Sequence, residues 1–216
     1  ECVKTSPLLG RKYGKTPPTL EEAYRIIEAL RYHGDKWRSK WGPLGDRNAA
    51  LAAFLLGTGL RIHEALLAVP GDVDQAHNTV HVIRGKGGKE RFAPISPHAL
   101  AELQAWLEQR AALGFTDSQP IFCVLEGSTA GGMMSQGYMR KKLHEAGRKA
   151  GVDKRVVCHQ WRHAYALHLD RSGVRTSSIS RALGHSNIAT TSIYLQGLSA
   201  EEILDDVLSA WTDGSE

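Results

Sequence analysis

The sequence predicts a mainly α-helical domain with one small antiparallel β-sheet, an α+β fold. Apolar residues recur at helical spacing along most of the 216 residues. Strand-like runs rich in β-branched residues are confined to two short stretches between residues 79 and 95. Strands therefore do not alternate with helices, which excludes a doubly wound parallel sheet. Hydrophobic residues make up 42% of the chain, enough to bury a sizeable core.

Helices dominate the first third of the chain. A capping box at residues 19–22 (TLEE) predicts the start of a helix, which we expect to run to about His33. Glycine and proline mark residues 34–45 as a loop. A second helix is expected from near Asp46 to the break at Gly57-Thr58-Gly59. The short helix that follows carries Arg61, Glu64 and Leu67.

In the middle of the chain the residue pattern changes from helix-like to strand-like. Residues 79–83 (TVHVI) and 91–95 indicate two antiparallel strands, joined by a basic, glycine-rich turn at residues 84–89. Ser96-Pro97 then predicts a helix with proline in its first turn. Residues 113–134 look irregular apart from the apolar run IFCV. The expected apolar face of the helix consists of Leu100, Leu103, Trp106 and Leu107.

Helical patterns return in the last third. Ser135 starts a helix that should end at about Ala150, and the pattern is helical from His159 onward. Glycines interrupt it at positions 173, 184 and 197. A second capping box at residues 199–202 (SAEE) opens a terminal helix. Its apolar residues are Ile203, Leu204, Val207, Leu208 and Trp211.

Composition narrows the classes of function. No apolar run approaches the length of a membrane span and no signal peptide opens the chain, so we expect a cytoplasmic protein. Because Glu1 stands where an initiator Met is expected, we also expect a fragment or a processed product. Three distant cysteines and ten scattered histidines indicate neither a disulfide framework nor a metal site. The net charge of +4 is compatible with nucleic acid but does not prove such a partner.

Four segments hold polar residues in suggestive groups. Each has an ordinary interpretation alone, because exposed Arg and Lys are the norm and a lone Tyr among apolar residues usually belongs to a core. The ordered combination is far more specific than any one of them. The segments are residues 58–64 (TGLRIHE), 85–91 (GKGGKER), 159–163 (HQWRH) and 183–185 (LGH), the last followed nine residues beyond its His by Tyr194.

The chain resembles the tyrosine recombinase (phage integrase) family at all four segments, in the family's order. The resemblance covers about residues 19–210. Two positions depart from the frequent residues, His63 where Ser is common and Trp161 where Leu is common, and neither holds a catalytic atom in the family. Arg61 and Glu64 fit T-G-[LM]-R-x-x-E, Lys86 fits G-K-G-x-K-x-R, His159 and Arg162 fit H-x-x-R, and His185 with Tyr194 fits L-G-H followed by Tyr.

The resemblance implies a site-specific recombinase that cuts and rejoins DNA. Tyr194 would attack the scissile phosphorus, expel the 5′-hydroxyl and form a 3′-phosphotyrosyl bond. A 5′-hydroxyl from another strand would reverse the step, so neither a cofactor nor a metal is implied. Integration of a mobile element is the first choice of role, with chromosome dimer resolution and DNA inversion left open. The six implied catalytic residues are Arg61, Lys86, His159, Arg162, His185 and Tyr194.

These residue types suit the chemistry. The transition state gains negative charge on its non-bridging oxygens, which the guanidiniums of Arg61 and Arg162 can bind and to which His185 can add a donor. His159 is the expected proton acceptor. Lys86 is the expected general acid, with Lys89 as a nearby rival.

Two further polar side chains lie in these segments without an expected catalytic role. Glu64 is expected to orient a basic neighbour, although an ordinary helix-surface carboxylate remains the alternative. His163 is expected to face elsewhere on its helix and to be structural.

Double-stranded DNA is the implied partner. Residues 1–18 form a basic linker or a solvated tail, residues 19–198 the catalytic domain, and residues 199–216 a C-terminal helix and tail. That helix either packs on its own domain or, as in relatives that form a homo-tetramer on paired DNA sites, on a neighbouring protomer. Basic side chains are expected to contact phosphates without reading sequence. The candidates are Lys12, Lys15, Arg84, Arg91, Arg140, Lys141 and Lys142.

Three alternatives remain open at this stage. A type IB topoisomerase uses similar chemistry but rejoins the original strand. A DNA-binding module with an inactive site would bind without forming a covalent adduct. A metal-dependent nuclease would need clustered carboxylates, for which Asp72 and Asp74, expected in a loop, are the one suggestive pair.

Overall fold

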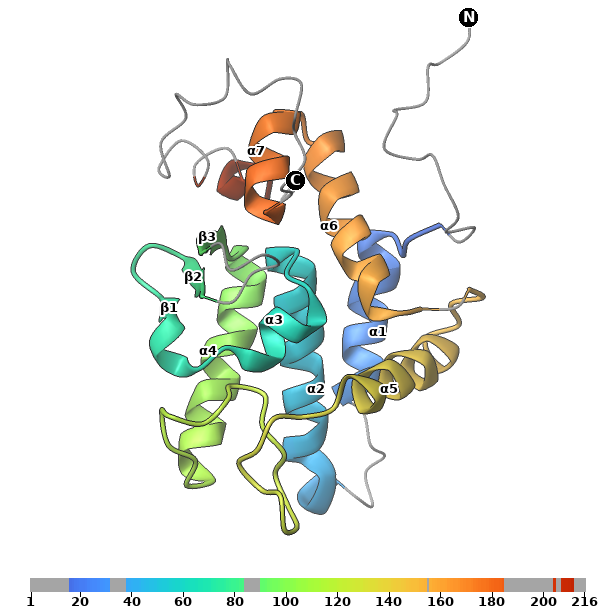
Figure 1. Ribbon diagram of the computed structural model, residues 1–216. Helices are drawn as coiled ribbons and strands as arrows, with labels where there is room; N and C mark the ends of the chain where they lie inside the picture. The colour runs from blue at the N-terminus through green and yellow to red at the C-terminus, as the bar shows by residue number, and fades with distance from the viewer. Residues whose placement is uncertain are drawn as a thin grey trace, which may run out of the picture.

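The computed structural model describes residues 16–31, 38–83, 90–154, 156–184, 204 and 207–211. These residues form a mainly helical fold with one three-stranded antiparallel sheet of order β1-β2-β3, which confirms the predicted fold class (Figure 1). No helix in this part of the chain is both long enough and apolar enough to span a bilayer. The helices are α1 Leu20–Arg31, α2 Arg38–Thr58, α3 Ile62–Leu67, α4 Pro97–Ala112, α5 Gln136–Lys149, α6 Cys158–Arg171 and α7 Thr176–Leu183, and the strands are β1 Val73–Asp74, β2 Thr79–Val82 and β3 Arg91–Pro94.

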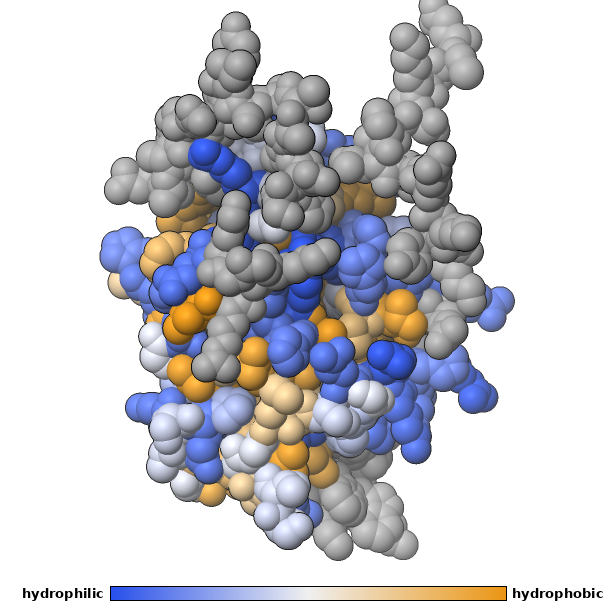
Figure 2. Space-filling view, viewed as in Figure 1, coloured by the Kyte–Doolittle hydropathy of each residue, from blue (hydrophilic) through white to orange (hydrophobic). Residues whose placement is uncertain are grey.

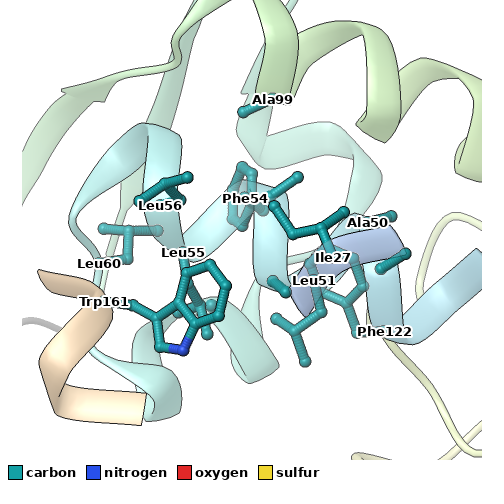
Figure 3. Packing of buried hydrophobic residues seen from close by; sticks show 14 of the residues in the cluster. Ile27, Ala50, Leu51, Phe54, Leu55, Leu56, Leu60, Ala99, Phe122 and Trp161 are labelled. Carbon is teal, nitrogen blue, oxygen red and sulfur yellow. The ribbon is translucent and has the colours of Figure 1, made fainter. Parts of the chain in front are cut away.

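Helix α2 runs through the centre of the molecule. Every residue from Ala49 to Leu56 is at most 1% exposed, so the helix is covered on all sides rather than on one stripe. Helices α1, α4 and α6 pack around it, and its alanines allow them to approach closely. Figure 3 shows Phe54 and Leu55 of α2 among side chains from several elements, including Trp161 of α6. The site described below lies at the carboxyl end of this buried helix.

The amino end of α2 differs from the prediction. Residues 34–45 were expected to form a loop, but the helix already begins at Arg38 and contains Pro43. Pro43 is the sixth residue of this helix, beyond the first turn, so its ring removes one helical hydrogen bond and disfavours the helix locally. The helix nevertheless packs on α1 and α4, and Asp46 accepts a hydrogen bond from Gln109 of α4 at 3.1 Å. Tertiary contacts have therefore overridden the local glycine and proline signal.

The capping box that starts α1 is present as predicted. The backbone N–H of Glu22 donates to Thr19 Oγ1 at 3.2 Å, and the N–H of Thr19 donates to Glu22 Oε2 at 2.8 Å. Lys154, in the connection between α5 and α6, pairs with the same carboxylate at 2.6 Å. The start of α1 is thus tied to the second half of the chain.

The sheet has one more strand than the sequence indicated. β1, only two residues long, pairs with β2, and β2 pairs with β3 in the predicted hairpin. Asp74 lies in this strand and Asp72 in the 3₁₀ turn Pro70–Asp72, rather than in a loop. Two residues are too few to show a period of two, which is why the pattern missed β1. On the outer face of the hairpin the ring of His81 stacks on that of Phe92, with 4.6 Å between centroids.

Residues 113–134 are irregular, as expected, and a buried arginine binds the first part of this stretch. Arg110 of α4 is 1% exposed and donates to the carbonyls of Thr116 at 2.6 Å, Gln119 at 2.9 Å and Pro120 at 3.3 Å. A guanidinium has five donors, so one side chain can satisfy several carbonyls of a segment that lacks a ladder of its own. Figure 2 shows one face of the whole molecule, on which apolar residues occur in patches among hydrophilic ones.

The described residues of the terminal helix pack on their own chain. Val207 is fully buried and Ala210 is 7% exposed, in a second apolar cluster with residues of α6 and α7. The ring of Trp211 lies 4.2 Å from that of His168 and 6.4 Å from that of Tyr165.

Candidate active site

A tight turn at Gly59 links the end of α2 to the start of α3. Gly59 has φ of +63°, a conformation that favours glycine, and a Cβ there would lie 2.5 Å from Tyr165 Cδ1. The hydroxyl of Thr58 donates to the carbonyl of Phe54 at 2.6 Å and accepts from the N–H of Leu60 at 3.2 Å. The Thr-Gly pair thus ends α2 and sets the direction in which Arg61 leaves the turn.

Glu64 organises the basic groups beside this turn. Its side chain is 2% exposed and accepts from the backbone N–H and from Nη1 of Arg61, both at 2.9 Å. Arg91 of β3 donates to the same two carboxylate oxygens, at 3.2 and 2.8 Å. Burial tends to raise the pKa of Glu64, but the hydrogen bonds from Arg91 and Arg61 outweigh it, and the net pKa is lowered. Glu64 is therefore an ionised carboxylate between two guanidiniums.

Arg162 approaches the same turn from α6. It is 4% exposed, and its two terminal nitrogens donate to the carbonyl of Gly59 at 2.8 Å and to that of Leu183 at 2.6 Å. Burial, followed by the positive charge of Arg61, lowers the pKa of Arg162 to about 10. The group remains charged at neutral pH. Two guanidiniums from distant parts of the sequence thus come within electrostatic reach of each other.

His159 lies one turn before Arg162 on α6. Burial lowers its pKa, and the charges of His163, Arg162 and Arg61 lower it further. The ring of His163 meets that of His159 edge to face, with 4.5 Å between centroids. The expectation that His163 faces elsewhere was therefore wrong. The i, i+4 spacing was the signal, because residues four apart share a helix face.

The structure brings together Arg61, Glu64, His159 and Arg162 among the predicted site residues. The basic residues of α5 form a separate group, in which Lys142 and Lys141 approach Glu145 at 3.1 and 4.0 Å and Arg140 is exposed. Among the described residues no group of three or more His, Cys, Asp or Glu side chains could hold a metal ion. The predicted residues outside the described ranges are Lys12, Lys15, Arg84, Lys86, Lys89, His185 and Tyr194.

Comparison with known proteins identifies the family. Residues 19–201 match the phage integrase family, and the chain belongs to that family. Tyrosine recombinase XerC of Xanthomonas campestris pv. campestris (strain B100) is 32% identical over 192 residues, which cover 89% of this chain and 56% of that protein. The chain thus spans little more than half the length of this curated relative.

Solved structures agree on the fold. The crystal structure of XerA recombinase has a TM-score of 0.65 and 24% identity, and the match covers 93% of this chain and 66% of that one. The XerH site-specific recombinase, solved bound to its difH substrate in a pre-cleavage complex, has a TM-score of 0.61 and 24% identity over 83% of this chain and 49% of that one. At this level of identity the two structures support the architecture alone.

Proposed function

We propose that this chain is the catalytic domain of a site-specific DNA recombinase that acts through a 3′-phosphotyrosyl intermediate on Tyr194. The observation that carries the proposal is the convergence of Arg61 and Arg162 on the turn at Gly59. Arg162 and Gly59 are 103 residues apart in the sequence, yet they form a hydrogen bond of 2.8 Å. Two charged, partly preorganised guanidiniums beside a histidine suit a phosphodiester whose oxygens gain charge during reaction.

In the proposed mechanism the arginines stabilise the negative charge on the phosphate, and a histidine accepts the proton of the nucleophile. Arg61 and Arg162 bind the non-bridging oxygens of the scissile phosphate, and each keeps donors beyond those used within the protein. His159 accepts the proton of the Tyr194 hydroxyl, because its lowered pKa keeps the imidazole neutral at pH 7. By resemblance, His185 adds a donor to the phosphate, and Lys86 or its neighbour Lys89 returns a proton to the leaving 5′-oxygen.

We also propose the partners of the whole protein. Double-stranded DNA is the substrate, and the cytoplasm is the compartment in which we expect the protein to meet it. The proposed phosphate contacts outside the centre are those of the linker, the hairpin and α5, namely Lys12, Lys15, Arg84, Arg140, Lys141 and Lys142. A homo-tetramer on paired sites, with the helix after residue 199 exchanged between copies, is the proposed assembly. Deleting residues 199–216 and measuring assembly on paired sites tests it, and unchanged assembly would remove the exchange.

A covalent capture experiment tests the proposed reaction. The protein is incubated with a pool of random-sequence duplexes, each carrying a nick that lets the cleaved fragment diffuse away. We expect the wild type to retain DNA on Tyr194 through a 3′ phosphate, and Tyr194→Phe to bind DNA without forming the adduct. If the wild type forms no adduct, the proposal that the chain cleaves DNA through Tyr194 is contradicted.

Two controls separate the neighbouring classes of enzyme. Strand exchange between two captured duplexes supports a recombinase, whereas relaxation of supercoiled DNA without exchange supports a type IB topoisomerase. Adduct formation in the presence of a chelator excludes a metal-dependent nuclease.

A further inference from the structure

Arg91 lies at the base of the hairpin and makes a buried ion pair. It is the first residue of β3, and its side chain is 13% exposed. Both terminal nitrogens donate to Glu64, in a fork-to-fork arrangement with distances of 3.2 and 2.8 Å. Each oxygen of Glu64 also accepts one bond from Arg61. Arg91 therefore shares one carboxylate with a proposed catalytic arginine.

The same guanidinium supports the end of α7. Arg91 Nε donates to the carbonyl of Ala182 at 3.4 Å. Gly184 closes over it so tightly that a Cβ at this position would lie 2.8 Å from Arg91 Cδ and Nε. The last carbonyls of a helix lack partners within the helix, and here Arg91 and Arg162 supply them. The residue after Gly184 is His185, so these bonds act on the segment that leads directly to a second proposed catalytic group.

The contacts of Arg91 differ from those expected of a phosphate-binding residue. Arg61, by comparison, donates to Glu64 through Nη1, and its side chain is 32% exposed. The fork of Arg91 faces the ionised carboxylate of Glu64, its Nε faces a backbone carbonyl, and its side chain is 13% exposed. Three segments of the site meet at this one side chain: the start of α3, the hairpin base and the end of α7.

We propose that Arg91 is a positioning residue for cleavage rather than a phosphate contact. It holds Glu64 and through it Arg61, and it fixes the end of α7 from which His185 follows. The inference rests on the proposed function, because it concerns the same reaction. It predicts that loss of Arg91 slows the chemical step at saturating DNA, whereas loss of a phosphate contact weakens binding and its dependence on salt.

The test compares Arg91→Gln and Arg91→Lys with the wild type on the duplex recovered by covalent capture. Arg171→Gln, an exposed residue in the last turn of α6, is the matched control for loss of one positive charge. For each protein we measure the single-turnover rate constant of adduct formation at saturating DNA, its amplitude, and the dissociation constant at several salt concentrations. An unfolded fraction lowers the amplitude alone, so the rate constant reports on the folded molecules.

We expect Arg91→Gln to lower the rate constant by about 100-fold, the scale of losing one preorganised donor. Arg91→Lys should be intermediate, because it keeps the charge beside Glu64 but loses the fork. Affinity and the slope of log affinity against log salt should match those of Arg171→Gln. An unchanged rate constant overturns the inference, and a slope reduced by about one with that unchanged rate identifies a phosphate contact instead. If the wild type forms no adduct, the proposed reaction has failed, which is distinct from a failure of Arg91.

Discussion

The carboxylate of Glu64 shows how much of this site depends on single residues. It pairs with two guanidiniums, those of Arg61 and Arg91, while its own side chain is only 2% exposed. Removing one partner of a buried ion pair leaves a charge without compensation, which costs far more than loss of a surface pair.

We therefore expect Glu64→Gln to lower the free energy of unfolding by roughly 3–5 kcal/mol. Urea denaturation measures the change. Glu145→Gln is the matched control, because its half-exposed pairs with Lys141 and Lys142 should contribute less than about 1 kcal/mol. Equal stability of the two variants would contradict the role assigned to Glu64.

The neutral form of His159 is the one that can accept a proton. Its pKa lies below the ordinary value of 6.5, because burial and the neighbouring positive charges disfavour the imidazolium. The rate of adduct formation should therefore fall as the pH is lowered, and the midpoint of this acidic limb of the pH–rate profile should lie below pH 6.5. Replacing His163 with Gln removes one of those charges, and we expect the limb to move upward. Single-turnover rates between about pH 5 and pH 8 measure both limbs, and a limb that stays in place in His163→Gln argues against the coupling.

Contacts between residues were predictable only where they are local in the sequence. The pairing of Arg61 with Glu64 follows from their i, i+3 spacing, and the position of Arg162 one turn after His159 follows from the helix between them. The bond from Arg91 to Glu64 spans 27 residues, and no periodic pattern encodes such a contact. For this reason the sequence suggested a phosphate contact for Arg91 and gave no sign of its buried partner.

At the scale of elements, the turn at Gly59 holds α2, α3 and α6 together. Gly59 and Gly173 both adopt positive φ, at +63° and +80°, but only Gly59 faces close neighbours. Gly173→Ala should cost about 1–2 kcal/mol of stability, the strain of a left-handed alanine. Gly59→Ala should cost roughly 1–3 kcal/mol more, because its Cβ collides with the ring of Tyr165 and with Leu183. Thermal unfolding of the two variants gives the comparison, and equal losses would mean that the ring moves aside freely.

The elements that sequence patterns predicted well are those with a clear apolar stripe and a cap. The helix α4 begins after Ser96, and α5 begins after Ser135, each with the serine hydroxyl accepting a backbone N–H. The patterns failed for one very short element and for one long, buried element. They could not detect a two-residue strand, and they started α2 too late, because tertiary packing rather than local propensity decides how far this helix extends.

At the scale of the whole molecule, the packing of Trp211 is open to a direct test. Its indole covers Tyr165 and His168 in cis. Trp211→Ala should lower the stability of the chain by roughly 2–3 kcal/mol, less than for a fully buried Trp because this side chain is only partly buried. Leu113→Ala removes an exposed leucine and serves as the control. If the two variants melt at the same temperature, the terminal helix does not rest on α6 in solution.

The buried apolar residues form two clusters, and α6 is the element common to both. Proteins open in cooperative units that follow such divisions, so the smaller cluster, with α7 and the end of the chain, should exchange its amide protons before α2 does. The bonds from Arg162 to Gly59 and Leu183 span the seam between the two units. A phosphate that binds Arg162 would therefore contact the side chain that joins the two units. Bound substrate would then stabilise the smaller unit against local opening. A duplex added to the protein should slow deuterium uptake in α7 and leave deuterium uptake in α2 unchanged.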